Sequence, residues 1–161
     1  LKGQSLDVDV VGVFSTQEEV GTRGAQVAAQ TVKPDIAIVF EGSPADDTFT
    51  PDYLIQTALG RGPMLRHIDA KMITNPRFIR YAIDLGEKLG IPVQQAVRTG
   101  GSTNGAPIHL SGLGVPVIVI GLPVRYIHTH HCYASLCDFE NSVKLAVEII
   151  KRLNADIIKN F

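Results

Sequence analysis

The 161-residue sequence predicts an α/β fold, with a mixed, mostly parallel sheet covered by helices on both faces. Three observations predict this class. Short runs rich in β-branched residues alternate along the chain with amphipathic stretches of helical length. Residues 115–122 (VPVIVIGL) form the longest apolar run, which is typical of a strand buried on both faces. No repeat, low-complexity tract or linker divides the chain, so we expect one segment over residues 1–161.

The first third of the chain predicts two strands and a helix between them. Residues 6–14 (LDVDVVGVF) alternate and then become apolar, which predicts a strand entering the core. A loop and a helix follow, and Pro34 ends that helix. The β-branched run at residues 36–41 predicts the second strand. Residues 42–53 are rich in Gly, Ser, Pro and Asp, which indicates a loop.

The rest of the chain continues this alternation. Asn75 and Pro76 predict the start of a helix, and Gly90 predicts its end. Further strands are expected over residues 62–68, 92–98 and 115–122, with a short helix over residues 108–113 and a loop from Pro123 to Ser135.

A long amphipathic helix is expected at the end of the sequence, capped by Asp138 and extending to Lys159. Helical spacing places four of its apolar residues on one face: Val143, Val147, Ile150 and Ile157.

Composition excludes several kinds of function. Fifteen basic and sixteen acidic residues leave a formal net charge of −1, so neither nucleic acid nor a membrane is an expected partner. No apolar run approaches the ~18–20 residues of a membrane span, and the first residues lack the order of a signal peptide. Cys132 and Cys137 are too few to staple this fold, so we expect reduced thiols and a cytoplasmic protein.

Residues that can bind metal ions follow the ends of three predicted strands. Glu18 and Glu19 follow the first, Glu41 ends the second, and His128 lies just beyond residues 115–122. Because α/β sheets bind ligands beyond the carboxyl ends of their strands, these side chains are expected to share one pocket. Carboxylates with an imidazole suit a divalent ion such as Zn²⁺ or Co²⁺.

Simpler interpretations of each residue remain open. Glu18 and Glu19 are also what the acidic first turn of a helix contains, and Glu41 is also compatible with a strand end that faces water. A local zinc cluster is disfavoured because its five candidate ligands crowd into one short stretch without paired CxxC elements: His128, His130, His131, Cys132 and Cys137. Gly100 and Gly101 match no phosphate-binding pattern, and we expect them to let the backbone approach a ligand or a neighbouring strand.

Three stretches together resemble a known family. Residues 15–25 (STQEEVGTRGA), 36–47 (IAIVFEGSPADD) and 99–130 (TGGSTNGAPIHLSGLGVPVIVIGLPVRYIHTH) are similar, in this order, to the glutamyl and deblocking aminopeptidases. These are cytosolic two-metal peptidases, some of which carry an endoglucanase label. The similarity runs from about Val10 to Asn141. It implies a three-layer, zinc-exopeptidase-like fold, peptide substrates, two divalent ions (Zn or Co) and a homo-oligomer at full length.

The resemblance also implies roles for individual residues. Glu18 matches the general base, while Glu19 and His128 match the side-chain ligands of one metal ion. Glu41 matches a ligand of the second ion, a position at which the family commonly has Asp. Gly100, Gly101 and Arg125 are expected to contact the substrate.

The sequence departs from the family pattern in two respects. Where the family often reads GGTDA, Ser102, Thr103 and Asn104 follow the two glycines, which removes an acidic residue. The family's first metal-binding His, its bridging Asp and its dimerisation insert belong to sequence upstream of this segment. We therefore expect the C-terminal part of a longer catalytic domain, with a fold incomplete at its N-terminal side. Such a segment is expected to bind metal poorly and to be inactive by itself.

The sequence leaves two alternative functions to compare with the peptidase. With half of the ligands missing, the chain fits a non-catalytic binding or assembly module that keeps a vestigial metal site. A carbohydrase of the endoglucanase kind is disfavoured, because no pair of carboxylates stands out as acid and nucleophile and the sequence has no tryptophan for sugar stacking.

Overall fold

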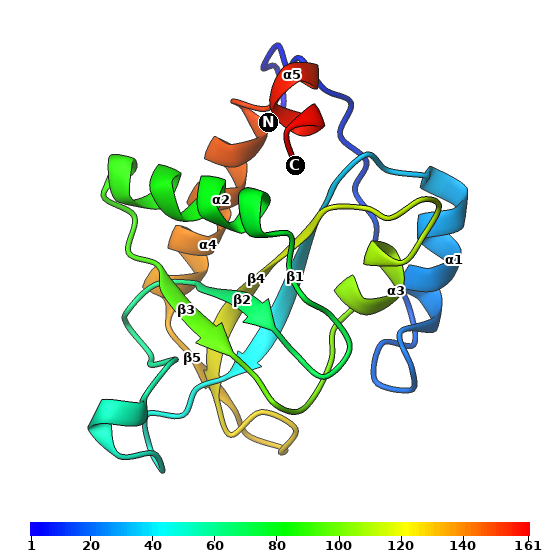
Figure 1. The fold of residues 1–161 in the computed structure, drawn as a ribbon. Coiled ribbons are helices and arrows are strands. Elements are labelled where there is room, and N and C mark those ends of the chain that lie inside the picture. Colours follow the sequence, from blue (N-terminus) through cyan, green and yellow to red (C-terminus); the bar gives the residue numbers. More distant parts are fainter.

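The structure is a computed structural model that describes all 161 residues. A five-stranded mixed sheet forms its centre (Figure 1). Strands β1 (Ala37–Pro44), β4 (Val117–Arg125), β2 (Met64–Ile68) and β3 (Gln94–Val97) lie side by side in that order, and β5 (Tyr133–Ala134) also pairs with β4. The pairs β1–β4 and β2–β3 are parallel, whereas β4 pairs with β2 and β5 in the antiparallel sense. The predicted α/β class is confirmed.

Helices cover both faces of the sheet. On one face, α2 (Pro76–Leu89) and α4 (Leu136–Ile150) pack against each other and against β4. On the other face, α3 (Gly105–His109) contacts β1 and β4, and α1 (Arg23–Val32) packs on α3 (Figure 1). The remaining elements are short: η1 (Asp52–Leu54) and α5 (Ala155–Lys159).

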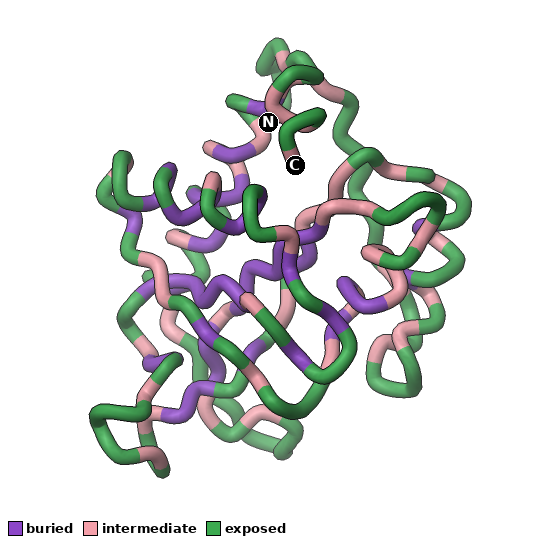
Figure 2. Tube along the Cα trace, in the orientation of Figure 1, coloured by how far each residue is buried: buried purple, intermediate pink, exposed green.

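Most residues of β4 are buried (Figure 2), and they divide between two core clusters. Ile118 and Ile120 join the larger cluster, which includes Phe78 of α2 and Leu145 of α4. Val117 and Val119 join a second cluster on the opposite face. Successive residues of a strand point to opposite faces, so a strand covered on both sides must be apolar at every position. The uninterrupted run that predicted a buried strand is therefore confirmed as the centre of the sheet.

Local signals correctly predicted the ends of two helices. The Asn75 side chain accepts hydrogen bonds from the backbone N–H groups of Arg77 and Phe78, and α2 ends at Gly90, whose φ of 63° favours glycine. Helix α1 ends at Val32, just before Pro34.

The strand predicted over residues 6–14 is wrong. This segment runs along the molecule without strand pairing, and most of its apolar residues are exposed, with Phe14 entirely accessible to solvent, although Val8 packs against the core. Alternating hydrophobicity indicates which face of a strand would be buried, but a strand also needs a neighbour for its backbone groups. Residues 6–14 have no such neighbour in the sheet.

The predicted last helix is also corrected. It consists of two helices, α4 and α5, and Ser135 rather than Asp138 caps α4. The carboxylate of Asp138 is instead fully buried and accepts hydrogen bonds of 2.7 Å from the backbone N–H groups of Gly60 and Gly62. The buried face of α4 contains Leu145, Ala146 and Ile149 while Val143 is exposed, which overturns the predicted apolar face.

Three other boundaries differ. The short helix predicted over residues 108–113 lies earlier, at α3. Strand β1 continues to Pro44, into the region predicted as a loop, and η1 lies further along that region. The loop predicted from Pro123 contains the end of β4 and the whole of β5. No helix combines the length and the apolar character needed to cross a membrane. Both cysteines are free thiols.

Candidate functional site

The second half of β1, in which Glu41 lies rather than at the predicted strand end, and the carboxyl end of β4 bring Glu41 and His128 toward the same edge of the sheet. The two strands are parallel neighbours, and Glu41 lies opposite Gly121 in their register. A side chain at Gly121 would collide with Ser43, because its Cβ would lie 2.4 Å from the Ser43 Oγ. His128 follows shortly after β4 ends at Arg125, in the turn that leads to β5.

Glu18 and Glu19 reach this edge from the turn before α1. The helix begins only at Arg23, so neither carboxylate lies in its first turn as the simpler interpretation had it. The turn is held against the helix by a hydrogen bond from the Gly24 N–H to the Thr16 carbonyl. A Cβ at Gly24 would lie 2.5 Å from the Thr16 backbone, so this close approach requires glycine.

Glu19 and His128 form a pair despite their distance in the sequence. The Nε2 atom of His128 lies 3.5 Å from Oε1 of Glu19, and both side chains are largely exposed. The two side chains meet although the strand expected before Glu19 does not form.

The pKa values of the other two carboxyl groups, Glu41 and Glu18, are affected by the same group of charged side chains. Burial raises the pKa of Glu41 to about 7, and Glu18 contributes to the rise while the Arg66 guanidinium opposes it. The pKa of Glu18 is also raised, first by desolvation and then by Glu19. Burial is thus the main cause of both shifts, and a neighbouring carboxylate adds to each of them.

Arg66 is a member of this region that the sequence analysis missed. It is buried on β2 and donates to the Asp69 carboxylate at 3.3 Å and to the Ser43 Oγ at 3.2 Å. Its Nε is buried without a hydrogen-bond partner. An arginine directly after the apolar residues Met64 and Leu65 of β2 was a signal for a charge with a buried partner, since buried charges need compensation.

Of the three residues expected to contact substrate, the two glycines are exposed and Arg125 is bound to a carboxylate. Gly100 and Gly101 are exposed, and a Cβ at either one would meet nothing within 4 Å, so no neighbouring strand approaches them. The φ of Gly101, 73°, is the conformational reason for glycine there. The Arg125 guanidinium contacts Asp47 through Nε (2.9 Å) and one terminal nitrogen (2.8 Å), which leaves its other terminal nitrogen without a hydrogen bond.

The donor chemistry fits a divalent cation only in part. Two carboxylates and an imidazole are the ligand types that Zn²⁺ or Co²⁺ accepts, and a cation would favour the ionised form of Glu41, whose pKa is raised by burial and then by Glu18. However, no three His, Cys, Asp or Glu side chains are grouped closely enough to form a metal centre. Glu19 and His128 are paired, whereas Glu41 stands apart from them.

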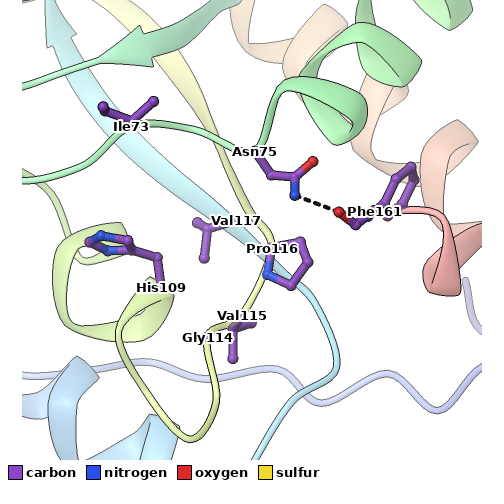
Figure 3. A pocket seen from close by; sticks show the side chains of 8 residues that line it. All are labelled: Ile73, Asn75, His109, Gly114, Val115, Pro116, Val117 and Phe161. Atoms are coloured by element: carbon purple, nitrogen blue, oxygen red, sulfur yellow. Dashed lines mark hydrogen bonds between the residues drawn. The ribbon is translucent and has the colours of Figure 1, made fainter.

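A cavity of about 360 Å³ lies away from this cluster (Figure 3). Its wall includes Val115 and Val117 at the start of β4, together with His109 and Phe161. It thus lies at the end of β4 opposite to Arg125, and none of the predicted site residues lines it.

The pKa of Glu41 predicts how stability depends on pH in the metal-free protein. Between its ordinary pKa of 4.5 and about 7, folded Glu41 holds a proton that the unfolded chain has released. The free energy of unfolding should therefore fall as pH rises through this window. Glu41→Gln should remove that part of the dependence and raise the melting temperature at pH 8, whereas Glu87→Gln, at an exposed position of α2, should not. Thermal melts from pH 4 to pH 8 test this, and a Glu41→Gln protein with the parent's pH dependence would contradict it.

Comparison with known proteins identifies the class. The M42 glutamyl aminopeptidase family matches residues 1–145, and the chain belongs to this family. The glutamyl aminopeptidase of Lactococcus lactis subsp. cremoris (strain MG1363) is 34% identical over 164 aligned residues, covering 100% of this chain and 45% of that protein. The lysyl aminopeptidase of Pyrococcus furiosus is 30% identical over 91% of this chain and 42% of its own length.

Solved structures agree with this assignment. The TET aminopeptidase from the marine sediment archaeon Thaumarchaeota archaeon SCGC AB-539-E09 superposes with a TM-score of 0.87 at 38% identity, over 91% of this chain and 41% of that one. A structure named endoglucanase, from Thermotoga maritima, gives a TM-score of 0.63 at 27% identity, over 84% of this chain and 39% of that one. The chain thus spans less than half the length of these relatives.

Proposed function

We propose that this chain forms the C-terminal part of the catalytic domain of a metal-dependent aminopeptidase. The observation that carries the proposal is the meeting of Glu19 with His128 beside Glu18 and Glu41, two carboxyl groups whose pKa values are raised by burial and by a neighbouring carboxylate. Membership of an aminopeptidase family and the coverage of 41–45% of three of the relatives support it. The residues upstream in the full-length protein would complete the ligand set.

The proposed roles divide the cluster by position. Glu19 and His128 would hold one divalent ion, and Glu41 would hold a second. When bound, two such ions polarise the scissile carbonyl and make an attacking water more acidic. Zn²⁺ and Co²⁺ are both compatible with these ligands.

Glu18 is proposed as the general base. Its raised pKa supports this role, because a carboxylate that holds a proton more tightly is a better acceptor near neutral pH. Glu18 would take a proton from the attacking water and pass it to the departing amine. Adjacent residues diverge in direction, so Glu19 can bind an ion while Glu18 faces the water.

The substrate would lie across the loop after β3. Gly101 and Gly100 leave its surface open, and Arg125 offers the terminal nitrogen that Asp47 does not use. We propose a peptide with a free N-terminus as substrate and an oligomeric full-length enzyme. A structure of the TET1 peptidase from Pyrococcus horikoshii, a more distant neighbour, bears a title describing assembly into a tetrahedron or an octahedral shell.

Metal removal tests the proposal in the full-length protein. A chelator should abolish the release of N-terminal residues from a peptide, and added Zn²⁺ or Co²⁺ should restore it. An N-acetylated copy of the peptide and a soluble β-glucan should both remain uncut. Cleavage that survives the chelator, or hydrolysis of the glucan in place of the peptide, would contradict the proposal. The 161-residue segment alone should bind zinc poorly and cleave nothing.

A further inference from the structure

Two consecutive aspartates close the neck of the loop that follows β1. Asp46 accepts hydrogen bonds from the Thr57 N–H (3.0 Å) and from Arg98 (2.9 Å). Asp47 accepts from the Leu59 N–H (3.0 Å) and from Arg125. Each carboxylate thus ties the returning end of the loop to one arginine. The two arginines differ in place, because Arg98 follows β3 and Arg125 ends β4.

The contact between Asp47 and Arg125 is bidentate and mostly sheltered. Nε and one terminal nitrogen of Arg125 donate to the two carboxylate oxygens at 2.9 and 2.8 Å, and only 9% of the Asp47 side chain is exposed. The Arg125 guanidinium holds the pKa of Asp47 below its ordinary value. Paired parallel hydrogen bonds of this kind fix the orientation of the guanidinium as well as its distance.

The turn that begins directly after Arg125 has an unusual backbone. Tyr126 and His128 adopt φ values of 59° and 63°, a region that residues other than glycine seldom occupy. The Thr129 hydroxyl braces the turn from inside, 2.6 Å from the Tyr126 carbonyl oxygen and 2.8 Å from that of His131. Such a conformation persists only where the surrounding contacts determine it. Arg125 anchors the entry to this turn.

We propose that Asp47 is a positioning residue, which fixes Arg125 and thereby the turn that presents His128 to Glu19. The inference rests on the proposed function, since it assigns His128 a metal ion to hold. It adds a residue of the loop after β1 to the groups on which the ion-binding geometry depends. It also assigns Arg125 a structural role, holding the turn that carries His128, in addition to the proposed contact with substrate.

Asp46 provides the matched control. It is the adjacent residue in the same loop, it also accepts one backbone N–H and one arginine, and it is also buried. None of its partners belongs to β4 or to the turn after it. Loss of either carboxylate should loosen the contact between the two ends of the loop. Only the loss of Asp47 should change the position of His128.

The test is zinc affinity of the full-length protein without substrate, measured by competition with a chromophoric chelator. Asp47→Asn should weaken zinc binding about tenfold, the lower end of what residues that orient metal ligands contribute. Asp46→Asn should leave the affinity unchanged. Arg125→Ala should weaken zinc binding as much as Asp47→Asn does. The double variant should bind zinc as well as Arg125→Ala alone, because both substitutions break the same contact between Asp47 and Arg125. Asp47→Glu, which keeps the charge, should recover part of the loss.

The outcomes separate this inference from the proposed function. If the parent protein binds zinc through Glu19 and His128 but Asp47→Asn binds it equally well, the positioning role is wrong and the peptidase proposal is untouched. Equal losses for Asp46→Asn and Asp47→Asn, or additive losses in the double variant, would also overturn it. If Asp47→Asn does not fold, Arg125→Lys takes its place, since lysine keeps the charge without the two-pronged contact. Parent-like zinc affinity in Arg125→Lys would then overturn the inference.

Discussion

Glu18→Gln in the full-length protein should lower kcat by about two to four orders of magnitude while the bound metal stays in place, the range that a positioned general base contributes. Gln keeps the shape of Glu but cannot accept the proton of the attacking water. Glu18 itself forms no close contact with His128, whereas Glu19 does, so the loss should fall on the chemical step and not on metal binding.

The measurement pairs steady-state kinetics with the zinc content of the purified protein. Glu87→Gln, an exposed carboxylate on α2, is the control for a general effect of charge. A Glu18→Gln enzyme that keeps most of its kcat would remove Glu18 from the role of base. A variant that loses both kcat and zinc would instead make Glu18 a ligand.

The second large effect is expected on zinc binding itself. His128→Ala or Glu19→Gln should each weaken zinc affinity of the full-length protein by more than about a hundredfold, since even residues that only orient a ligand contribute about 10–100-fold. The first change removes the imidazole and the second replaces the carboxylate with a neutral amide, in the pair of groups that meet at 3.5 Å. Activity should fall in parallel.

Two neighbouring histidines provide controls for this experiment. His130 and His131 are exposed in the same turn and pack against each other, with no carboxylate partner. His130→Ala and His131→Ala should therefore retain parent-like zinc affinity. Loss of zinc in these two variants but not in His128→Ala would favour the local histidine and cysteine cluster that the sequence analysis set aside.

The elements predicted correctly are those whose signals are local. Asn75 and Gly90 mark the ends of α2 through hydrogen bonds and backbone angles that adjacent residues determine. The apolar run of β4 marks burial on both faces, whatever covers them. Residues 6–14 failed because pairing depends on a partner elsewhere in the chain, which the pattern does not identify.

The candidate site was predictable to a similar extent. The rule that strand ends gather at one edge does not explain why Glu19 meets His128, because no strand precedes Glu19. The rule did not reveal Arg66 or Asp47, because the partner of a charged residue can be identified only once the fold brings the two together. The prediction of Asp138 as a helix cap is wrong for the same reason: its two glycine partners lie far away in the sequence.

The most direct test of the account is anomalous diffraction at the zinc edge from crystals of the full-length protein. The account predicts a peak within about 2.0–2.2 Å of both a Glu19 carboxylate oxygen and a His128 imidazole nitrogen, the usual zinc–ligand distances, and a second peak beside Glu41. Zinc bound instead among His130, His131 and Cys132, or no peak at the carboxyl ends of β1 and β4, would contradict it.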